Sequence, residues 1–283
     1  MESLVSTQEL ETMLGETGEK PLRVLDATIF LPGSARDAKA EFDAAHIPGA
    51  QYMDLDAIVD PESPLAHALP RPQQFGQAMS ALGVSDTDRI VVYDNSPLHS
   101  AARAWWMLKA FGATDVAILD GGFPKWLAEG RACESGPASV VPANFSVSYG
   151  SDRFAEKHDL AAILHSNGHE IADARSAARF AGEEGEPRPG ITAGHIPGSR
   201  NLPQALLFDA DNSYKSPPGL RAAFETARID LSKPLITTCG SGVTAAVIAF
   251  AAHLLGKEDV KLYDGSWNEW GSDPETPKAV GRE

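Results

Sequence analysis

The sequence predicts an α/β protein of two tandem domains, each a mostly parallel sheet flanked by helices on both faces. Three observations support this prediction: a length of 283 residues, short β-branched runs that alternate with helical patterns, and a long internal repeat. Alternation of strands and helices is typical of parallel sheets covered on both faces. A chain of this length can form two domains that each bury a core.

The repeat consists of four landmarks that occur in the same order in each half. They are a strand-like run ending in Asp-Ala, a His-Ile-Pro-Gly motif, a strand-like run ending in Asp94 or Cys239, and an Asp-Gly pair followed by Trp. Asp94 and Cys239 lie 145 positions apart, and Asp120 and Asp264 lie 144 apart. A period this long indicates a duplicated domain rather than a solenoid.

The local patterns place the elements and the boundary between the halves. In the first half we expect strands over residues 22–25, 50–53, 89–93 and 115–119, and helices over 72–82, 100–111 and 122–129. In the second half we expect a short buried strand over 234–238 and an apolar helix over 245–255. The segment 134–144 has the small, Pro-containing composition of a linker. These patterns predict a domain over residues 1–135, a linker over 136–150 and a second domain over 151–283.

Composition argues against several classes of partner. The formal net charge of -15 disfavours nucleic acid and anionic membranes. Residues 1–10 lack the basic and apolar regions of a secretory signal, and the longest apolar run, 243–255, is too short to span a bilayer. The two cysteines, Cys133 and Cys239, lack zinc-type spacing and fit a reducing compartment. We therefore expect a cytoplasmic protein, with no role for Cys133.

The chemistry is predicted at the loop 239–244, Cys-Gly-Ser-Gly-Val-Thr, between the strand and helix of the second half. Because glycine tolerates positive φ and has no Cβ, this backbone can curl with its N–H groups towards the Cys239 sulfur. The partial positive charge at a helix start favours an anion there. A thiolate held in this way can attack sulfur. The alternative is a buried structural cysteine.

The first half has Asp94 where the second has Cys239. A carboxylate cannot carry a sulfane sulfur, so the first domain is expected to lack the thiol chemistry. Ligands gather at the carboxyl ends of strands in open parallel sheets, which is where Cys239 lies.

The tandem halves, both His-Ile-Pro-Gly motifs, the Asp-Gly-Ser-Trp at 264–267 and the cysteine loop resemble the rhodanese sulfurtransferases over almost the whole chain. Thiosulfate-specific members carry basic residues directly after the cysteine. Here Gly240 and Ser241 follow it, as in the members that use 3-mercaptopyruvate. The resemblance implies two rhodanese-like domains, a catalytic Cys239, and a persulfide held by the loop residues Gly240, Gly242, Val243 and Thr244.

The resemblance also implies two substrate arginines, Arg179 in Ala-Arg-Phe and Arg188 in Glu-Pro-Arg. The planar guanidinium suits a carboxylate, and two of them fix its direction. For Arg188 the alternative is a solvated loop charge. For Arg175, which follows a predicted strand directly, we expect an internal ion pair at the sheet edge.

From the first domain, the resemblance implies Asp56 and His67 as groups that poise the chemistry. A neutral imidazole can move a proton near pH 7, and a carboxylate can hold its tautomer. Without the resemblance, His67 would be a surface-loop histidine. His46 and His195, which occur in both halves, are expected to be structural, and the tryptophans to be core or cleft wall.

The implied reaction moves sulfur from 3-mercaptopyruvate to Cys239, with release of pyruvate, and then to a thiol such as thioredoxin, a small thiol, or cyanide. Ser241, with His67 and Asp56 behind it, would relay the proton. No metal or organic cofactor is implied. This reaction requires a thiol that is reachable from solvent and close to the guanidinium groups.

Three alternatives remain open. One is thiosulfate:cyanide transfer by the same cysteine, and another is a non-catalytic sulfur carrier. The third is phosphatase or arsenate reductase chemistry, which wants an arginine six residues after the cysteine, where this chain has Ala245. The sulfur acceptor, the biological purpose and the oligomeric state are not determined by the sequence.

Overall fold

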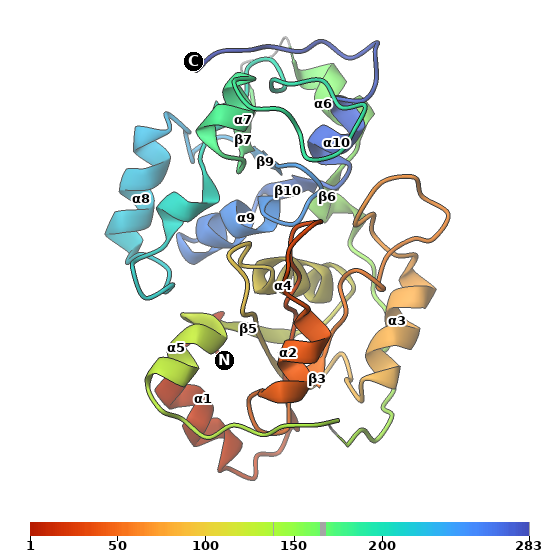
Figure 1. Cartoon of the computed structure of the whole chain (residues 1–283), viewed down its shortest axis with the longest axis vertical. Coiled ribbons are helices and arrows are strands. Elements are labelled where there is room, and N and C mark those ends of the chain that lie inside the picture. Colours follow the sequence, from red (N-terminus) through yellow and green to blue (C-terminus); the bar gives the residue numbers. More distant parts are fainter. Residues whose placement is uncertain (138, 165–167, 283) are drawn as a thin grey trace. The chain divides into compact units, whose positions relative to one another are not determined.

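The computed structural model describes residues 1–137, 139–164 and 168–282 (Figure 1). It divides into two compact units. The first unit is Met1–Asp60, Leu69–Gly150 and Ala210–Ser213, and the second is Pro61–Ala68, Ser151–Asp209 and Tyr214–Glu283. Each unit holds one half of the repeat, but the loop that carries His67 belongs to the second unit.

The first unit is built on a five-stranded sheet of order β1-β5-β4-β2-β3, in which every pair of neighbouring strands is parallel. Its strands are β1 (Leu4–Val5), β2 (Leu22–Asp26), β3 (Gln51–Tyr52), β4 (Arg89–Tyr93) and β5 (Asp115–Leu119). Its helices are α1 (Thr7–Leu14), α2 (Ala38–Ala44), α3 (Pro72–Ala81), α4 (Ala101–Ala110) and α5 (Gly122–Ala128). Because β4 is the central strand, its carboxyl end places Asp94 at the middle of the sheet edge.

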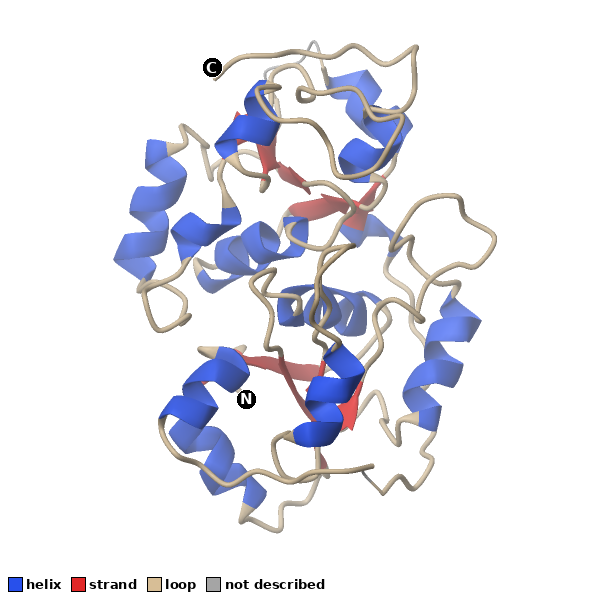
Figure 2. Ribbon diagram, viewed as in Figure 1, coloured by secondary structure: helices blue, strands red, loops and turns tan. Residues whose placement is uncertain are grey.

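Helices cover both faces of this sheet (Figure 2). Alternate side chains of a strand point to opposite faces, and Val91 and Tyr93 of β4 share one buried cluster with residues of α1, α2 and α5. Helix α4 packs on β4 and β5 instead, where the indole nitrogen of Trp105 donates to the Val116 carbonyl at 3.1 Å. Helix α4 contributes no residue to the first cluster, which places it on the other face.

The second unit repeats this design with the parallel order β6-β10-β9-β7-β8. Its strands are β6 (Phe154–Ala155), β7 (Glu170–Asp173), β8 (Arg200–Asn201), β9 (Leu235–Thr238) and β10 (Val260–Tyr263). Its helices are α6 (Lys157–Ile163), α7 (Ala177–Ala181), α8 (Pro217–Thr226), α9 (Ala245–Leu254) and α10 (Ser266–Trp270), with short 3-10 helices η1 (Ser151–Arg153) and η2 (Gln204–Leu207). The central strand β9 ends directly before Cys239.

The buried layers of the second unit explain the apolar character of α9. Helices α6 and α10 pack on one face of the sheet, where Leu160, Trp267 and Trp270 join Ile236 of β9. Helix α9 contacts β9 and β10 and also η2, and residues 245–252 of it are all buried. A helix covered on all sides is apolar all round, as this sequence is. All five tryptophans of the chain are buried.

The two His-Ile-Pro-Gly motifs do the same structural work in the two units. In the first unit Nδ1 of His46 lies 2.8 Å from the Phe42 carbonyl, and the two rings stack at 4.1 Å. In the second, Nδ1 of His195 lies 2.8 Å from the Phe180 carbonyl, and the rings stack at 3.8 Å. The expectation that both histidines are structural is confirmed.

Most predicted elements are present, but the first 45 residues hold more structure than the sequence analysis expected. The strands over 89–93 and 115–119 have the predicted bounds, and α9 ends one residue early. Strand β1 and helices α1 and α2 were not predicted. Helix α1 has a readable signal, because Ser6 and Glu9 form a capping box. Among the described residues, no helix is long and apolar enough to cross a membrane.

Candidate active site

The loop that follows Cys239 is anchored from below by the start of α10. The backbone N–H of Cys239 donates to the Ser266 hydroxyl at 3.2 Å, and the Cys239 carbonyl accepts from the Trp267 N–H at 3.0 Å. Ser266 is fully buried and its hydroxyl donates in turn to the Tyr263 carbonyl at 2.8 Å. The Asp-Gly-Ser-Trp motif therefore holds the cysteine at the carboxyl end of β9.

The loop backbone carries unused hydrogen-bond donors. Within the described part of the chain, the N–H groups of Gly240, Ser241, Val243 and Thr244 donate to no acceptor. Gly242 has a φ of 79°, in the left-handed region that glycine adopts without steric cost. Buried or half-buried N–H groups are ordinarily paired, so this cluster can receive an anionic ligand.

The Cys239 thiol is less accessible to solvent than the sequence analysis predicts. Cys239 is buried, with 2% of its surface exposed. The next two residues, Gly240 and Ser241, are partly exposed, and the side chain of Arg179 is 19% exposed. A ligand that reaches the sulfur therefore has to displace some of the groups that cover it.

Arg179, on α7, lies against the cysteine loop. A Cβ placed on Gly240 would lie 3.1 Å from Nη2 of Arg179, so the guanidinium and the residue after the cysteine are in close contact. Nη2 pairs with a carboxylate oxygen of Glu186, whereas the buried Nε has no hydrogen-bond partner among the described residues. One donor of this arginine is thus paired within the protein, and another has no partner among the described residues.

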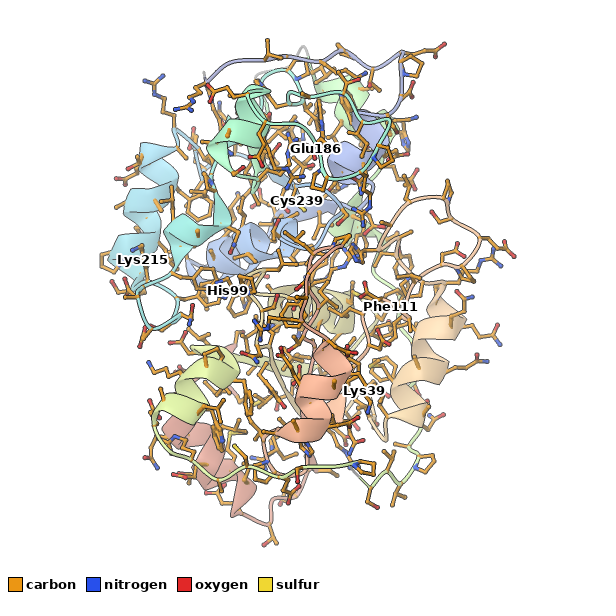
Figure 3. All side chains as sticks on the ribbon, viewed as in Figure 1. Lys39, His99, Phe111, Glu186, Lys215 and Cys239 are labelled. Carbon is orange, nitrogen blue, oxygen red and sulfur yellow. The ribbon has the colours of Figure 1, made fainter. Side chains whose placement is uncertain are left out.

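Glu186 lies between two arginines and is almost fully buried. Its carboxylate accepts from Nη1 of Arg175 at 2.7 Å as well as from Arg179. Arg175 also binds Asp173 at 2.6 Å and lies over the Trp267 ring at 4.7 Å. The expected internal ion pair of Arg175 is confirmed. Figure 3 labels Glu186 and Cys239, both in the second unit.

Arg188 is tied to the cysteine loop through one side chain. With the Asn268 amide assigned in the orientation that satisfies both of its partners, Nη1 of Arg188 donates to the side-chain oxygen at 2.9 Å, and the amide nitrogen donates to the Gly240 carbonyl at 3.0 Å. Arg188 is therefore not a freely solvated charge.

His67 and Ser241, far apart in the sequence, meet in the second unit. Nδ1 of His67 lies 2.9 Å from the Ser241 hydroxyl. His67 has a φ of 58°, a conformation that costs energy for a non-glycine residue and often marks a functional position. Asp56 is exposed and belongs to the first unit, so its pairing with His67 stays a prediction.

Sequence reasoning missed Glu186, Ser266 and Asn268. Glu186 lies in the Glu-Pro-Arg motif and Ser266 in the Asp-Gly-Ser-Trp motif, so the signal for both is their place beside residues that the motifs single out. Nothing in the sequence indicates the side-chain partners of Asn268, since Gly240 and Arg188 lie in separate loops.

In the first unit, the position of the cysteine is filled by a carboxylate with its own donors. Asp94 accepts from the Ser96 N–H at 3.0 Å and from the Ala101 N–H at the start of α4 at 2.8 Å. Burial raises the pKa of Asp94 to about 6, against the two backbone hydrogen bonds that lower it.

Comparison with known proteins identifies the same tandem architecture elsewhere. The rhodanese-like domain family matches residues 6–129 and 156–273. The chain is 43% identical to mouse 3-mercaptopyruvate sulfurtransferase, over 95% of this chain and 91% of that protein. It is 40% identical to rat thiosulfate sulfurtransferase, over 99% of this chain and 96% of that protein. The crystal structure of SseA from Escherichia coli, described as a 3-mercaptopyruvate sulfotransferase with the rhodanese fold, superposes with a TM-score of 0.85 at 37% identity and covers 94% of this chain and 99% of its own.

Proposed function

Since this chain belongs to the rhodanese family, we propose that it is a 3-mercaptopyruvate sulfurtransferase that works through a persulfide on Cys239. The observation that carries the choice of donor is the contact between Arg179 and Gly240, next to the cysteine, with a buried Nε that has no partner among the described residues. A guanidinium with an unused donor beside the nucleophile fits a substrate that carries a carboxylate.

The substrate is held by two arginines that converge on one loop. Arg179 contacts Gly240 directly, and Arg188 reaches the Gly240 carbonyl through Asn268. The carboxylate of 3-mercaptopyruvate binds these guanidiniums, which directs its sulfur towards Cys239. Binding at two points gives orientation as well as affinity.

The first half-reaction transfers sulfur to the enzyme. The Cys239 thiolate attacks the substrate sulfur, an S–S bond forms, and the C–S bond breaks with its electron pair moving to carbon. The enolate of pyruvate that results takes up one proton, which Ser241 relays with His67 behind it at 2.9 Å. Asp56 is proposed to hold the tautomer of His67.

The persulfide is stabilised by the loop and then consumed by an acceptor. The N–H groups at Gly240, Ser241, Val243 and Thr244 have no acceptor among the described residues, and with Gly242 they form the cradle for the sulfane sulfur. A thiol such as thioredoxin, a small thiol, or cyanide attacks the outer sulfur and restores the Cys239 thiolate. No metal or organic cofactor takes part in this scheme.

Thiosulfate is the competing donor. The near-equal identity to the mouse and rat proteins does not separate the two donors, so the choice depends on the site. The loop has Gly240 and Ser241 after the cysteine, without a cation for a sulfonate group, and this favours mercaptopyruvate.

The test is a comparison of kcat/KM for the two donors, with cyanide as the common acceptor and Cys239→Ser as the blank. We expect a higher value for 3-mercaptopyruvate, with ping-pong kinetics. A higher value for thiosulfate would overturn the choice of donor. Mass spectrometry of donor-treated protein separates the remaining case, because one added sulfur on Cys239 without transfer to any acceptor would identify a carrier.

A further inference from the structure

The Asn268 side chain, on α10, bonds to both an arginine and the cysteine loop. The side chain is buried, with 8% of the residue exposed. Its oxygen accepts from Nη1 of Arg188 at 2.9 Å and its nitrogen donates to the Gly240 carbonyl at 3.0 Å. The backbone N–H of Asn268 donates to the same carbonyl at 2.9 Å. One residue therefore connects a guanidinium to the residue next to Cys239.

The two substrate arginines are held in different ways. Arg179 projects from α7 and pairs with Glu186, which Arg175 and Asp173 connect to the end of β7. Arg188 lies in the loop between α7 and β8, and within the described residues its one side-chain hydrogen bond is to Asn268. Removal of Asn268 therefore releases Arg188 but leaves the ion pairs of Arg179 intact.

The chemistry of the amide suits this position. An amide is both an acceptor, for Arg188, and a donor, for the Gly240 carbonyl. An aspartate in its place accepts from Arg188 but sets a carboxylate oxygen against the Gly240 carbonyl. It also neutralises the guanidinium charge that a substrate carboxylate needs. A neutral bridge keeps the arginine in place and keeps its charge available.

We propose that Asn268 is a positioning residue that fixes Arg188 relative to Cys239 and thereby favours donors that carry a carboxylate. This inference rests on the proposed function, because it assigns Arg188 to the substrate carboxylate. Asn268 belongs to α10 and bonds to both Gly240 and Arg188. It therefore couples the position of the carboxylate-binding arginine to that of the loop that holds Cys239.

The kinetic test compares wild type, Asn268→Ala and Asn268→Asp with 3-mercaptopyruvate and with thiosulfate. For Asn268→Ala we expect KM for mercaptopyruvate to rise about tenfold, the effect of losing one hydrogen bond to a charged group, with a smaller change in kcat. For Asn268→Asp we expect a rise of about thirtyfold, because the carboxylate also competes for Arg188. Transfer from preformed Cys239 persulfide to cyanide should keep its wild-type rate in both variants.

Ser272→Ala, two residues beyond the end of α10, is the matched control. The Ser272 hydroxyl donates to the backbone carbonyls of Asn268 at 2.7 Å and Glu269 at 3.0 Å and is not hydrogen bonded to Arg188, so this variant should keep the wild-type KM. An unchanged KM in Asn268→Ala would overturn the inference. Equal losses with both donors and in the cyanide step would overturn it as well, because they indicate general damage to the fold.

A second readout separates this inference from the proposed function. Crystal structures of wild type and Asn268→Ala give the position of the Arg188 guanidinium whichever donor the enzyme uses. We expect the Arg188 guanidinium to move away from the position it has beside residue 268 in the wild type. If the wild type fails to use mercaptopyruvate, the proposed function is wrong. If Arg188 keeps its place in the variant, the positioning role is wrong.

Discussion

The two strand-to-helix loops of this protein have the same place in the fold but dispose of their backbone N–H groups differently. In the first unit, Asp94 accepts from Ser96 and Ala101, and the Asn95 N–H donates to the Thr28 hydroxyl at 2.8 Å. In the second unit, four loop N–H groups have no acceptor among the described residues. N–H groups of the first loop bind the carboxylate of Asp94, whereas those of the second loop are available to a ligand.

A second difference lies at the end of the neighbouring strand. Asp26 is the last residue of β2 and accepts from the hydroxyl and the N–H of Thr28. Asp173 has the same place on β7 but binds Arg175, which leads through Glu186 to Arg179. The arginine at the place of Thr28 thus connects the end of the strand, through ion pairs, to Arg179 beside the cysteine loop. The two units thus share a fold but differ in the charged side chains at the ends of equivalent strands.

The largest expected effect is the loss of transfer in Cys239→Ser. Sulfurtransferase activity should fall at least about a thousandfold, because serine is not ionised at neutral pH and cannot carry a sulfane sulfur. The measurement is turnover with 3-mercaptopyruvate and cyanide, with Cys133→Ser as the control that keeps full activity. Residual turnover near the wild-type value would show that the first unit is not inert.

Asp94→Asn tests how much the buried carboxylate of the first loop lowers the stability of the protein at neutral pH. Since burial raises the pKa of Asp94 to about 6 from 3.8, the folded state keeps a proton between about pH 4 and pH 6 that the unfolded state loses. Wild-type stability therefore falls, relative to the variant, as pH rises through this window, by about 3 kcal/mol in all.

Chemical unfolding of both proteins at pH 4 and pH 7 measures this difference. The exposed Glu16 provides the control, since Glu16→Gln should leave the pH dependence as in wild type. A difference between wild type and Asp94→Asn that is the same at both pH values would contradict a buried, protonated Asp94.

Arg179→Ala should chiefly weaken the use of 3-mercaptopyruvate. We expect KM to rise about a hundredfold, because a charge-assisted pair with the substrate carboxylate is lost. Steady-state kinetics measure this, and Arg282→Ala, which removes an exposed partner of Glu183, is the control. An unchanged KM would show that Arg179 does not bind the substrate carboxylate.

His67→Ala has the smallest expected effect. We expect kcat to fall about tenfold, less than the usual loss of about a hundredfold or more for a proton-transfer group, because Ser241 retains its hydroxyl. A pH profile of kcat compares the variant with wild type, and His158→Ala, in which an exposed histidine on α6 is removed, serves as the control. A wild-type kcat would mean that Ser241 acts unaided.

The sequence alone was sufficient for the duplication, the buried strands and the place of Cys239. The strands over 89–93 and 115–119 were predicted residue for residue, because continuous apolar runs bounded by turns reflect a parallel sheet buried on both faces. The short β1 and the small helix α2 offer no such run and were missed. The limits of the domains and the roles of the site residues remain predictions.

The tertiary structure alone decided which groups meet at the cysteine loop. Glu186 between two arginines and Asn268 between Arg188 and Gly240 are contacts among loops that are distant in the sequence. Periodicity and turn chemistry describe neighbours along the chain, so they predict elements. Side-chain pairs across loops depend on how those elements pack, and the burial of Cys239 belongs to the same class. The sequence determined the position of Cys239 between its strand and helix, and packing determined the charges placed around it.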